Sequence, residues 1–417
     1  MTMKKHLITV CMGMLGLMLP ACSSNSDPDN PNPIPPLEDI NLSPDETAIN
    51  DGINTFAFEL LNTTDAKCAE IYESQYDGNV SVSPLSATLA LAMLANAGDD
   101  ALTDATTKLL HCSGLAELNT VSNKLMRHLT TSGKLELANA VWYNPQRIAI
   151  NSSFVKSMAD TFYADVDRAD FGTDKATDLI NAWCAARTHG KISKILNDTS
   201  QDDVFYLINA LYFNDEWAYK FSKSDTGPGT FADRTIEAMM HNDYSGNFFA
   251  NDRYSCVEMP FKNGTSMHIL LPADTDTDAA QTLARSLTYT QWKDDLASAK
   301  KYRIILSLPR FDINRAGRLD KALFAMGLPQ GGSSLSKMGT SLTDRQYQLI
   351  VIQKTATTVN ERGAEVAAAT VVGGVTAAAP EEESGLVTFT VDRPFVYLIT
   401  NQKTGTVLMA GRINTIM

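Results

Sequence analysis

The chain has 417 residues, of which 44% are hydrophobic and 20% charged, a composition typical of an ordered globular protein with a sizeable core. Its formal net charge of −13 offers no basic surface to a phosphate backbone, which argues against nucleic acid as a partner. The length allows two or three average domains or one large one.

The first 21 residues are typical of a secretory signal peptide. Lys4 and Lys5 precede an apolar run from Leu7 to Leu19, which is too short for a comfortable transmembrane helix. The sequence LPAC then ends at Cys22 and resembles the bacterial lipobox, in which this cysteine carries the lipid; an ordinary signal cut nearby is the alternative. We therefore expect a lipid-anchored protein in the cell envelope of a Gram-negative bacterium, facing the periplasm or the cell surface.

Residues 22–47 are rich in Pro, Asn, Ser and Asp, and this composition buries too little apolar surface to fold. They predict a flexible tether between the lipid and a domain that covers residues 48–417. Four cysteines remain after processing, widely spaced and without a CxxC pair, so we expect buried free thiols rather than a disulfide framework or metal ligands.

The first half of the domain is predicted to be mostly helical. Apolar residues recur at helical spacing from about residue 50, and further helices are expected over 85–98, 100–114, 152–164 and 176–192. A strand is expected over 135–144. Residues 204–217 are almost continuously apolar, which is typical of a strand buried on both faces.

The second half is predicted to be richer in strands. Residues 254–263 and 265–274 form a probable hairpin around Asn263–Gly264, and a strand over 302–313 is followed by a helix over 316–328. The last 30 residues predict strands with a turn at 401–406. Because helices dominate early and strands late, without a βαβ alternation, the sequence favours one large α+β domain.

An unusual segment, residues 363–383, lies between two of these predicted strands. Its sequence GAEVAAATVVGGVTAAAPEEE has side chains too small to fill a core, yet it is too apolar for an ordinary linker. Composition alone would also allow a disordered linker here.

Six segments resemble the serpin family, in the order in which that family carries them. They span most of residues 50–417 and lie at 79–98, 188–192, 207–217, 308–313, 359–370 and 392–399. The resemblance implies three β-sheets, eight or nine helices and an exposed reactive loop at about 361–385. It also implies a suicide substrate: a protease cleaves the loop and is acylated, and the loop inserts into the main sheet before the protease can deacylate.

The residues at the start of this loop fit insertion. With the family's usual loop length, Ala364, Val366, Ala368, Thr370 and Val372 face the core and Glu365 faces solvent, so the inward positions are all small. Gly363 supplies a flexible hinge. The resemblance assigns the hinge to Glu361, Gly363, Ala364, Glu365, Val366, Ala367, Ala368, Ala369 and Thr370.

Family spacing counted from Glu361 places the cleaved bond between Ala377 and Ala378. Because the loop is longer than usual, Val372, Val375 and Thr376 remain candidates for the residue before the cut. Neither Lys nor Arg lies between Gly363 and Ser384, so a trypsin-like protease would find no suitable residue. The expected targets are elastase-like serine proteases, with papain-like cysteine proteases as a second group.

The resemblance also implies two supporting clusters. The shutter beneath the main sheet would contain Ser83, Ser86, Asn209 and Gln353, where Gln353 replaces a histidine usual in the family. A glutamine can donate and accept hydrogen bonds but cannot titrate. The breach, where the loop enters the sheet, would contain Trp217 and an ion pair between Arg310 and Glu361.

An enzyme is not indicated, because the histidines are not accompanied by an HExxH, GxSxG or P-loop motif. We expect no catalytic residues, no metal and no cofactor, and a monomer whose partners are target proteases and, through the anchor, a membrane. Two alternatives remain: a non-inhibitory serpin that serves as a binding module, and a surface lipoprotein that binds glycans.

Overall fold

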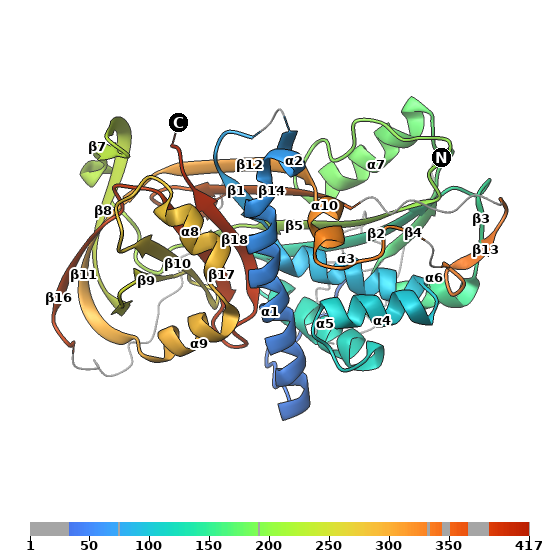
Figure 1. Cartoon of the computed structure of the whole chain (residues 1–417), viewed down its shortest axis with the longest axis horizontal. Coiled ribbons are helices and arrows are strands. Elements are labelled where there is room, and N and C mark those ends of the chain that lie inside the picture. The colour runs from blue at the N-terminus through green and yellow to red at the C-terminus, as the bar shows by residue number, and fades with distance from the viewer. Residues whose placement is uncertain are drawn as a thin grey trace, which may run out of the picture.

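A computed structural model of the chain describes residues 33–73, 76–190, 192–331, 334–343, 351–365 and 383–416. Helices come mainly from the first half of the described chain and strands mainly from the second (Figure 1), which confirms the predicted α+β class. A helix of 23 residues, α1 (Pro44–Ala66), lies between the strand-rich and the helix-rich parts of the molecule (Figure 1).

Some of the helices begin at side-chain caps. Ser43 and Glu46 form a capping box at the start of α1, in which the Ser43 amide donates to Glu46 Oε2 at 2.8 Å. The other α-helices of the described residues are α2 (Cys68–Tyr72), α3 (Pro84–Ala97), α4 (Asp100–Leu109), α5 (Leu115–Thr130), α6 (Ser152–Phe162), α7 (Asp174–Arg187), α8 (Ala279–Ser286), α9 (Tyr289–Ala297) and α10 (Asp320–Ala325).

The largest sheet of the described residues has nine strands. Its order is β1 (Val80–Val82), β18 (Val407–Ile413), β17 (Phe395–Asn401), β10 (Thr265–Pro272), β9 (Tyr254–Pro260), β8 (Arg234–Ala250), β11 (Lys300–Pro309) and β16 (Leu386–Thr390), with β7 (Gly227–Phe231) paired to β8. The predicted hairpin joins β9 and β10, and Gly264 adopts a φ of +82° in its turn.

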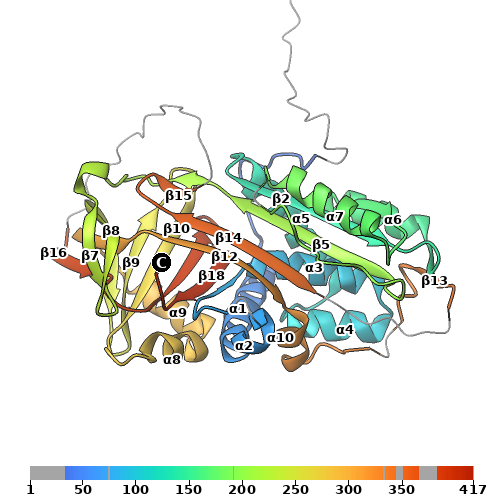
Figure 2. The same ribbon diagram turned by 90° about the horizontal axis from the view of Figure 1, so that it is seen from above.

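Two further sheets lie side by side. One has the order β12 (Phe311–Arg318), β14 (Ile352–Val359), β15 (Gly363–Glu365) and β6 (Asp215–Glu216), and the other has the order β4 (Asp165–Arg168), β2 (Leu135–Tyr143) and β5 (Phe205–Phe213). Figure 2 shows β5 and β14 running alongside each other. A two-stranded ladder of β3 (Ile148–Ile150) and β13 (Gly339–Ser341) completes the described sheets.

Several predicted boundaries were wrong. The strand expected over 302–313 is two strands in different sheets, because the chain leaves the nine-stranded sheet at Arg310. The helix expected over 316–328 is shortened to Asp320–Ala325, since Ala316–Arg318 still pair with β14. The helix expected over 100–114 ends at Leu109.

The end of the predicted tether is packed on the domain. Ile40 is 4% exposed, and Leu37 and Leu42 contact the core. The Leu37 amide donates to Thr131 Oγ1 at 2.9 Å, and Lys403 Nζ donates to Asp39 Oδ1 at 2.7 Å. Residues 33–47 are therefore held against the body, because apolar side chains among the prolines reach its core, while residues 22–32 lie outside the described residues.

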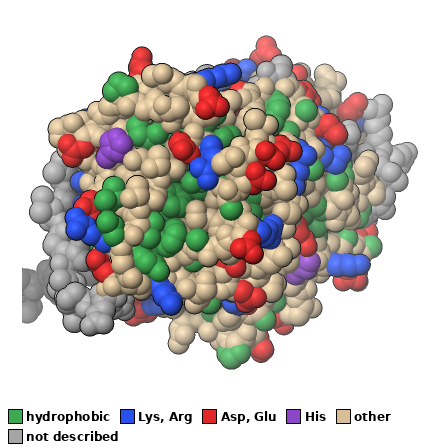
Figure 3. Space-filling model, turned by 60° about the vertical axis from the view of Figure 1, so that its left-hand side comes forward, with side chains coloured by type: hydrophobic (Ala, Val, Ile, Leu, Met, Phe, Trp, Pro, Cys, Tyr) green, Lys and Arg blue, Asp and Glu red, His purple; other side chains and the backbone are tan. Residues whose placement is uncertain are grey.

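The surface carries charges of both signs. Figure 3 shows one face on which acidic and basic side chains are interspersed rather than gathered by sign. In the part of the chain that the structure describes, no helix is both long enough and apolar enough to span a bilayer.

Candidate functional site

The short strand β15 lies between β14 and the two-residue strand β6, and it belongs to the segment that the sequence assigned to a hinge. Ala364 is paired with Val359 of β14 on one side and with Asp215 of β6 on the other. Its side chain is 1% exposed and belongs to the hydrophobic core. The first residues of the predicted loop are thus already part of a sheet.

The backbone of Gly363 packs closely against the backbone of β6. A Cβ atom at this position would lie 2.0 Å from the Asp215 carbonyl oxygen and 2.8 Å from the Glu216 Cα. Such distances exclude any side chain unless the backbone moves, so the glycine lets β15 approach β6. The sequence suggested only a flexible hinge, whereas the structure shows a packing requirement.

Trp217 holds the turn that leads into β15. Its ring is 1% exposed and stacks on Phe261 with ring centroids 4.2 Å apart. Its Nε1 donates to the Asn360 carbonyl at 2.9 Å, and its backbone amide donates to the Arg362 carbonyl at 2.9 Å. The predicted breach tryptophan therefore contacts the hinge turn through both its side chain and its backbone.

Arg310 and Glu361 form an ion pair at the same turn. The Glu361 side chain is 5% exposed and that of Arg310 is 46% exposed. Burial acts to raise the pKa of Glu361, but hydrogen bonds from its own backbone, from Arg310 and from Thr226 outweigh it and hold the pKa below its ordinary value.

This lowered pKa predicts a pH dependence. The charged form of Glu361 stabilises the fold above the ordinary glutamate pKa, and this stabilisation is lost as the pH falls through the lower folded-state value. We expect Glu361→Gln to lower Tm relative to wild type at about pH 6 and the difference to shrink as the pH falls below the ordinary glutamate pKa of about 4.3. A difference that stays constant in thermal scans across this range would contradict the assignment.

Beyond β15, which we call the hinge strand, β5 and β14 are not paired with each other. Among the described residues, β5 pairs with β2, whereas β14 pairs with β12 and, at Thr358 and Val359 only, with β15. We call the stretch between residues 205–214 and residues 352–357 the unpaired interval. The unpaired interval continues the line of β15. It separates the sheet that contains β14 from the sheet that contains β5.

Three of the four predicted shutter residues, Ser83, Ser86 and Gln353, form one cluster. Gln353 Oε1 accepts from the Ser83 amide and Gln353 Nε2 donates to the Ser83 carbonyl, both at 2.8 Å. The Ser83 hydroxyl donates to the Leu408 carbonyl at 2.9 Å and lies 3.0 Å from Ser86 Oγ. The glutamine thus ties β14 to the start of α3 through two backbone groups.

Asn209 belongs to a separate pair. Its Nδ2 donates to Asn139 Oδ1 at 2.6 Å, and Asn139 Nδ2 donates to the Phe162 carbonyl at 2.8 Å. Asn209 Oδ1 is buried without a hydrogen-bond partner among the described residues. Sequence reasoning missed Asn139, although its polar amide inside an apolar strand was a visible signal.

Removing the Gln353 amide would leave the buried Ser83 amide without its acceptor, while the Ser83 carbonyl would keep its hydrogen bond from the Ala87 amide at 3.1 Å. We expect Gln353→Ala to lower the free energy of unfolding by about 1–3 kcal/mol. Gln330→Ala serves as the control, since Gln330 is exposed. Equal urea midpoints for the two variants would show that the Ser83 contact does not contribute.

Asp215 is the second residue that sequence reasoning missed. It is 2% exposed, and its carboxylate accepts hydrogen bonds from Asn263 Nδ2 at 2.7 Å and from the Glu216 amide at 2.8 Å. Burial is the main reason that the pKa of Asp215 lies above its ordinary value. Next to it, Lys220 and Lys262 lower the pKa of Glu216 to about 2 through hydrogen bonds.

The rest of the predicted loop cannot be placed. Residues 366–382 lie outside the described residues, as does Cys22. They include the predicted hinge residues Val366, Ala367, Ala368, Ala369 and Thr370 and the candidate cleavage residues Val372, Val375, Thr376, Ala377 and Ala378. No group of three potential metal ligands occurs in the described ranges, and Cys68, Cys112, Cys184 and Cys256 are free thiols there.

Comparison with known proteins identifies the family. The family described as serpin (serine protease inhibitor) matches residues 51–416, so the chain belongs to the serpins, which are generally protease inhibitors rather than catalysts. It is 28% identical to leukocyte elastase inhibitor A of Mus musculus over 86% of this chain and 97% of that protein. It is 27% identical to Iripin-1 of Ixodes ricinus over 87% and 93%.

Solved structures show the same fold. The thermophilic serpin tengpin in its native state aligns with a TM-score of 0.73 at 25% identity, covering 91% of this chain and 97% of that one. Human thyroxine-binding globulin aligns with a TM-score of 0.76 at 20% identity, covering 89% and 100%. The predicted serpin fold is therefore confirmed, with ten α-helices among the described residues because short segments such as α2 count separately.

Proposed function

We propose that this serpin is a suicide-substrate inhibitor whose cleaved loop inserts into the unpaired interval and traps an acylated protease. The observation that carries the proposal is β15, which is already paired with strands on both sides and points into the interval. Strand addition at an open edge supplies main-chain hydrogen bonds, and small side chains offer little obstruction.

The register of β15 defines which residues of β14 and β5 each loop residue would face after insertion. Ala364 pairs with Val359 and Asp215, and each further loop residue would pair one position earlier on β14 and β5. Continued in this way, Thr370 falls opposite both Gln353 and Asn209. Its hydroxyl would then lie near the buried Asn209 Oδ1, which now has no partner among the described residues.

The target class follows from the side chains of the loop. The candidate cleavage residues are Ala, Val and Thr, which suit a small apolar specificity pocket rather than the acidic pocket of a trypsin-like protease. The similarity to a leukocyte elastase inhibitor agrees with this class. Elastase-like serine proteases are the proposed targets, and papain-like cysteine proteases are a second group.

A denaturing gel tests the proposal. The full chain incubated with pancreatic elastase should give a band that resists SDS and combines both masses, whereas trypsin should give none. Mass spectrometry of the released peptide would then define the bond, with Ala377–Ala378 expected. Cleavage by elastase without a stable adduct would instead make this a non-inhibitory member of the family.

We further propose that the mature chain is anchored in the cell envelope through a lipid on Cys22, since LPAC follows a signal-like segment. Cys22→Ala should move the protein from the membrane fraction to the soluble fraction. Protease treatment of intact cells would distinguish the periplasm from the cell surface. A variant that stays in the membrane fraction would contradict the anchor.

A further inference from the structure

A cavity of about 400 Å³ lies beside the hinge strand, within the size range of small-molecule sites. The end of α5, the start of β2, the β9–β10 turn and the β17–β18 turn line it, and Glu38 of the N-terminal segment lies at its rim. We call it the α5–β10 cavity. Its apolar lining consists of Leu129, Leu135 and Phe213.

Two of the side-chain acceptors that line the cavity, those of Asp215 and Asn401, are already occupied. Asp215 Oδ1 accepts from Asn263 Nδ2 at 2.7 Å and from the Glu216 amide at 2.8 Å, and its Oδ2 accepts from the Asn263 amide at 3.1 Å. Asn401 Oδ1 accepts from the amides of Lys403 at 3.1 Å and Thr404 at 2.9 Å. A donor ligand would therefore compete with existing hydrogen bonds at Asp215 and Asn401.

Donors that line the cavity are instead left over. Thr265 is 5% exposed, and its Oγ1 has no hydrogen-bond partner among the described residues. The Lys134 ammonium makes no ion pair or hydrogen bond with the described chain, although it interacts electrostatically with Asp215, whereas the Lys403 ammonium is paired with Asp39. A buried hydroxyl without a partner is uncommon in folded proteins, and beside an ammonium an anionic acceptor would satisfy both groups.

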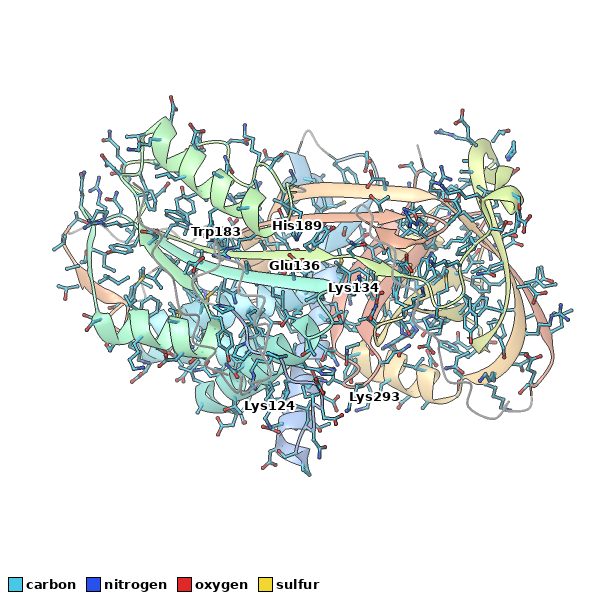
Figure 4. The ribbon with its side chains drawn as sticks, turned by 180° about the vertical axis from the view of Figure 1, so that it is seen from behind. Lys124, Lys134, Glu136, Trp183, His189 and Lys293 are labelled. Atoms are coloured by element: carbon cyan, nitrogen blue, oxygen red, sulfur yellow. The ribbon has the colours of Figure 1, made fainter. Side chains whose placement is uncertain are left out.

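We propose that the α5–β10 cavity binds a small organic carboxylate. Its carboxylate would lie between Lys134 and Thr265, because a charged acceptor satisfies an ammonium and a hydroxyl with strong hydrogen bonds. Its apolar body would contact Leu129, Leu135 and Phe213. Figure 4 shows Lys134 at the start of β2, apart from Lys124 and Lys293, which lie on other elements.

The site does not depend on protease inhibition. Its lining residues lie outside the reactive loop, and a ligand could bind even if the loop trapped nothing. It nevertheless adjoins the hinge, because Asp215 lines the cavity with its side chain and pairs with Ala364 through its backbone.

Isothermal titration of the full chain with three six-carbon probes tests the charge preference. Hexanoate should bind, while hexanamide, which has the same length and no charge, should bind at least about 10-fold more weakly, and hexylamine more weakly still. The absence of binding by hexanoate, equal affinity for hexanoate and hexanamide, or tighter binding of hexylamine would overturn the proposal.

Variants then locate the site. Lys134→Met should weaken hexanoate binding at least about 10-fold and leave hexanamide unchanged, and Thr265→Val, which preserves shape, should weaken hexanoate binding several-fold. Lys108→Met removes an exposed lysine of α4 and should change nothing. Unchanged Tm values verify folding, and an effect of Lys108→Met equal to that of Lys134→Met would contradict a defined site.

Discussion

Ala368→Arg is expected to abolish the trapping of elastase and to turn the chain into a substrate. In the continued register Ala368 falls opposite Thr355 and Leu211, which are both buried. Burying an unpaired guanidinium there costs several kcal/mol. If about 3 kcal/mol of this appears in the barrier, insertion slows about 100-fold and deacylation overtakes it. The measurement is the amount of SDS-resistant complex per mole of inhibitor cleaved.

Ala367→Arg is the matched control, since it adds the same side chain one residue earlier. This residue falls opposite Tyr212, which is itself 9% exposed but whose ring lies 5.4 Å from the ring of His189, and the His189 side chain is 60% exposed. An arginine on that face can reach solvent with its charged end. The control should keep trapping elastase. Loss of trapping in both variants would contradict the assignment of Ala368 to the buried face of the inserted strand and of Ala367 to the opposite face.

Asp65→Ala is expected to have the largest effect on stability. Asp65 is fully buried, and its carboxylate accepts from Arg412 Nε at 2.5 Å and from Arg285 Nε at 2.7 Å. The Arg412 side chain is itself only 2% exposed. Removing the carboxylate leaves this cation buried without its partner, which typically costs about 3–5 kcal/mol.

The comparison is with Asp39→Ala, which breaks an ion pair at the surface. Asp39 is 95% exposed and pairs with Lys403, and solvent screens such a surface pair, so its removal should leave the urea midpoint close to that of wild type. Urea unfolding midpoints of both variants measure the contrast. Similar midpoints for Asp65→Ala and wild type would show that the buried pair is replaced by other contacts.

Much of the fold was predictable because local patterns and tertiary packing agree in it. The continuous apolar run over 204–217 did become strands, β5 and the short β6, and the small residues after Gly363 marked an unusual segment. The order of helices and strands gave the α+β class. These features depend on periodicity and residue size, which the sequence displays directly.

What escaped prediction depends on contacts between distant segments. The need for glycine at 363 comes from its approach to Asp215, and no local pattern encodes that distance. Strand β8 was missed because its burial alternates weakly, and exposed polar residues interrupt it. The packing of residues 33–43 was missed because proline-rich composition suggested a free tether, although Leu37 and Ile40 were available to reach the core.

The central claim is that the native chain is kinetically held, with its loop not yet inserted. Thermal unfolding before and after a single cut between residues 366 and 382 tests it most directly. Insertion of about ten residues adds at least about ten hydrogen bonds of about 1 kcal/mol each, and each kcal/mol raises Tm by about 1 °C in a domain of about 370 residues. The account predicts a rise of about 10 °C or more, and an unchanged Tm in the cut protein would contradict it.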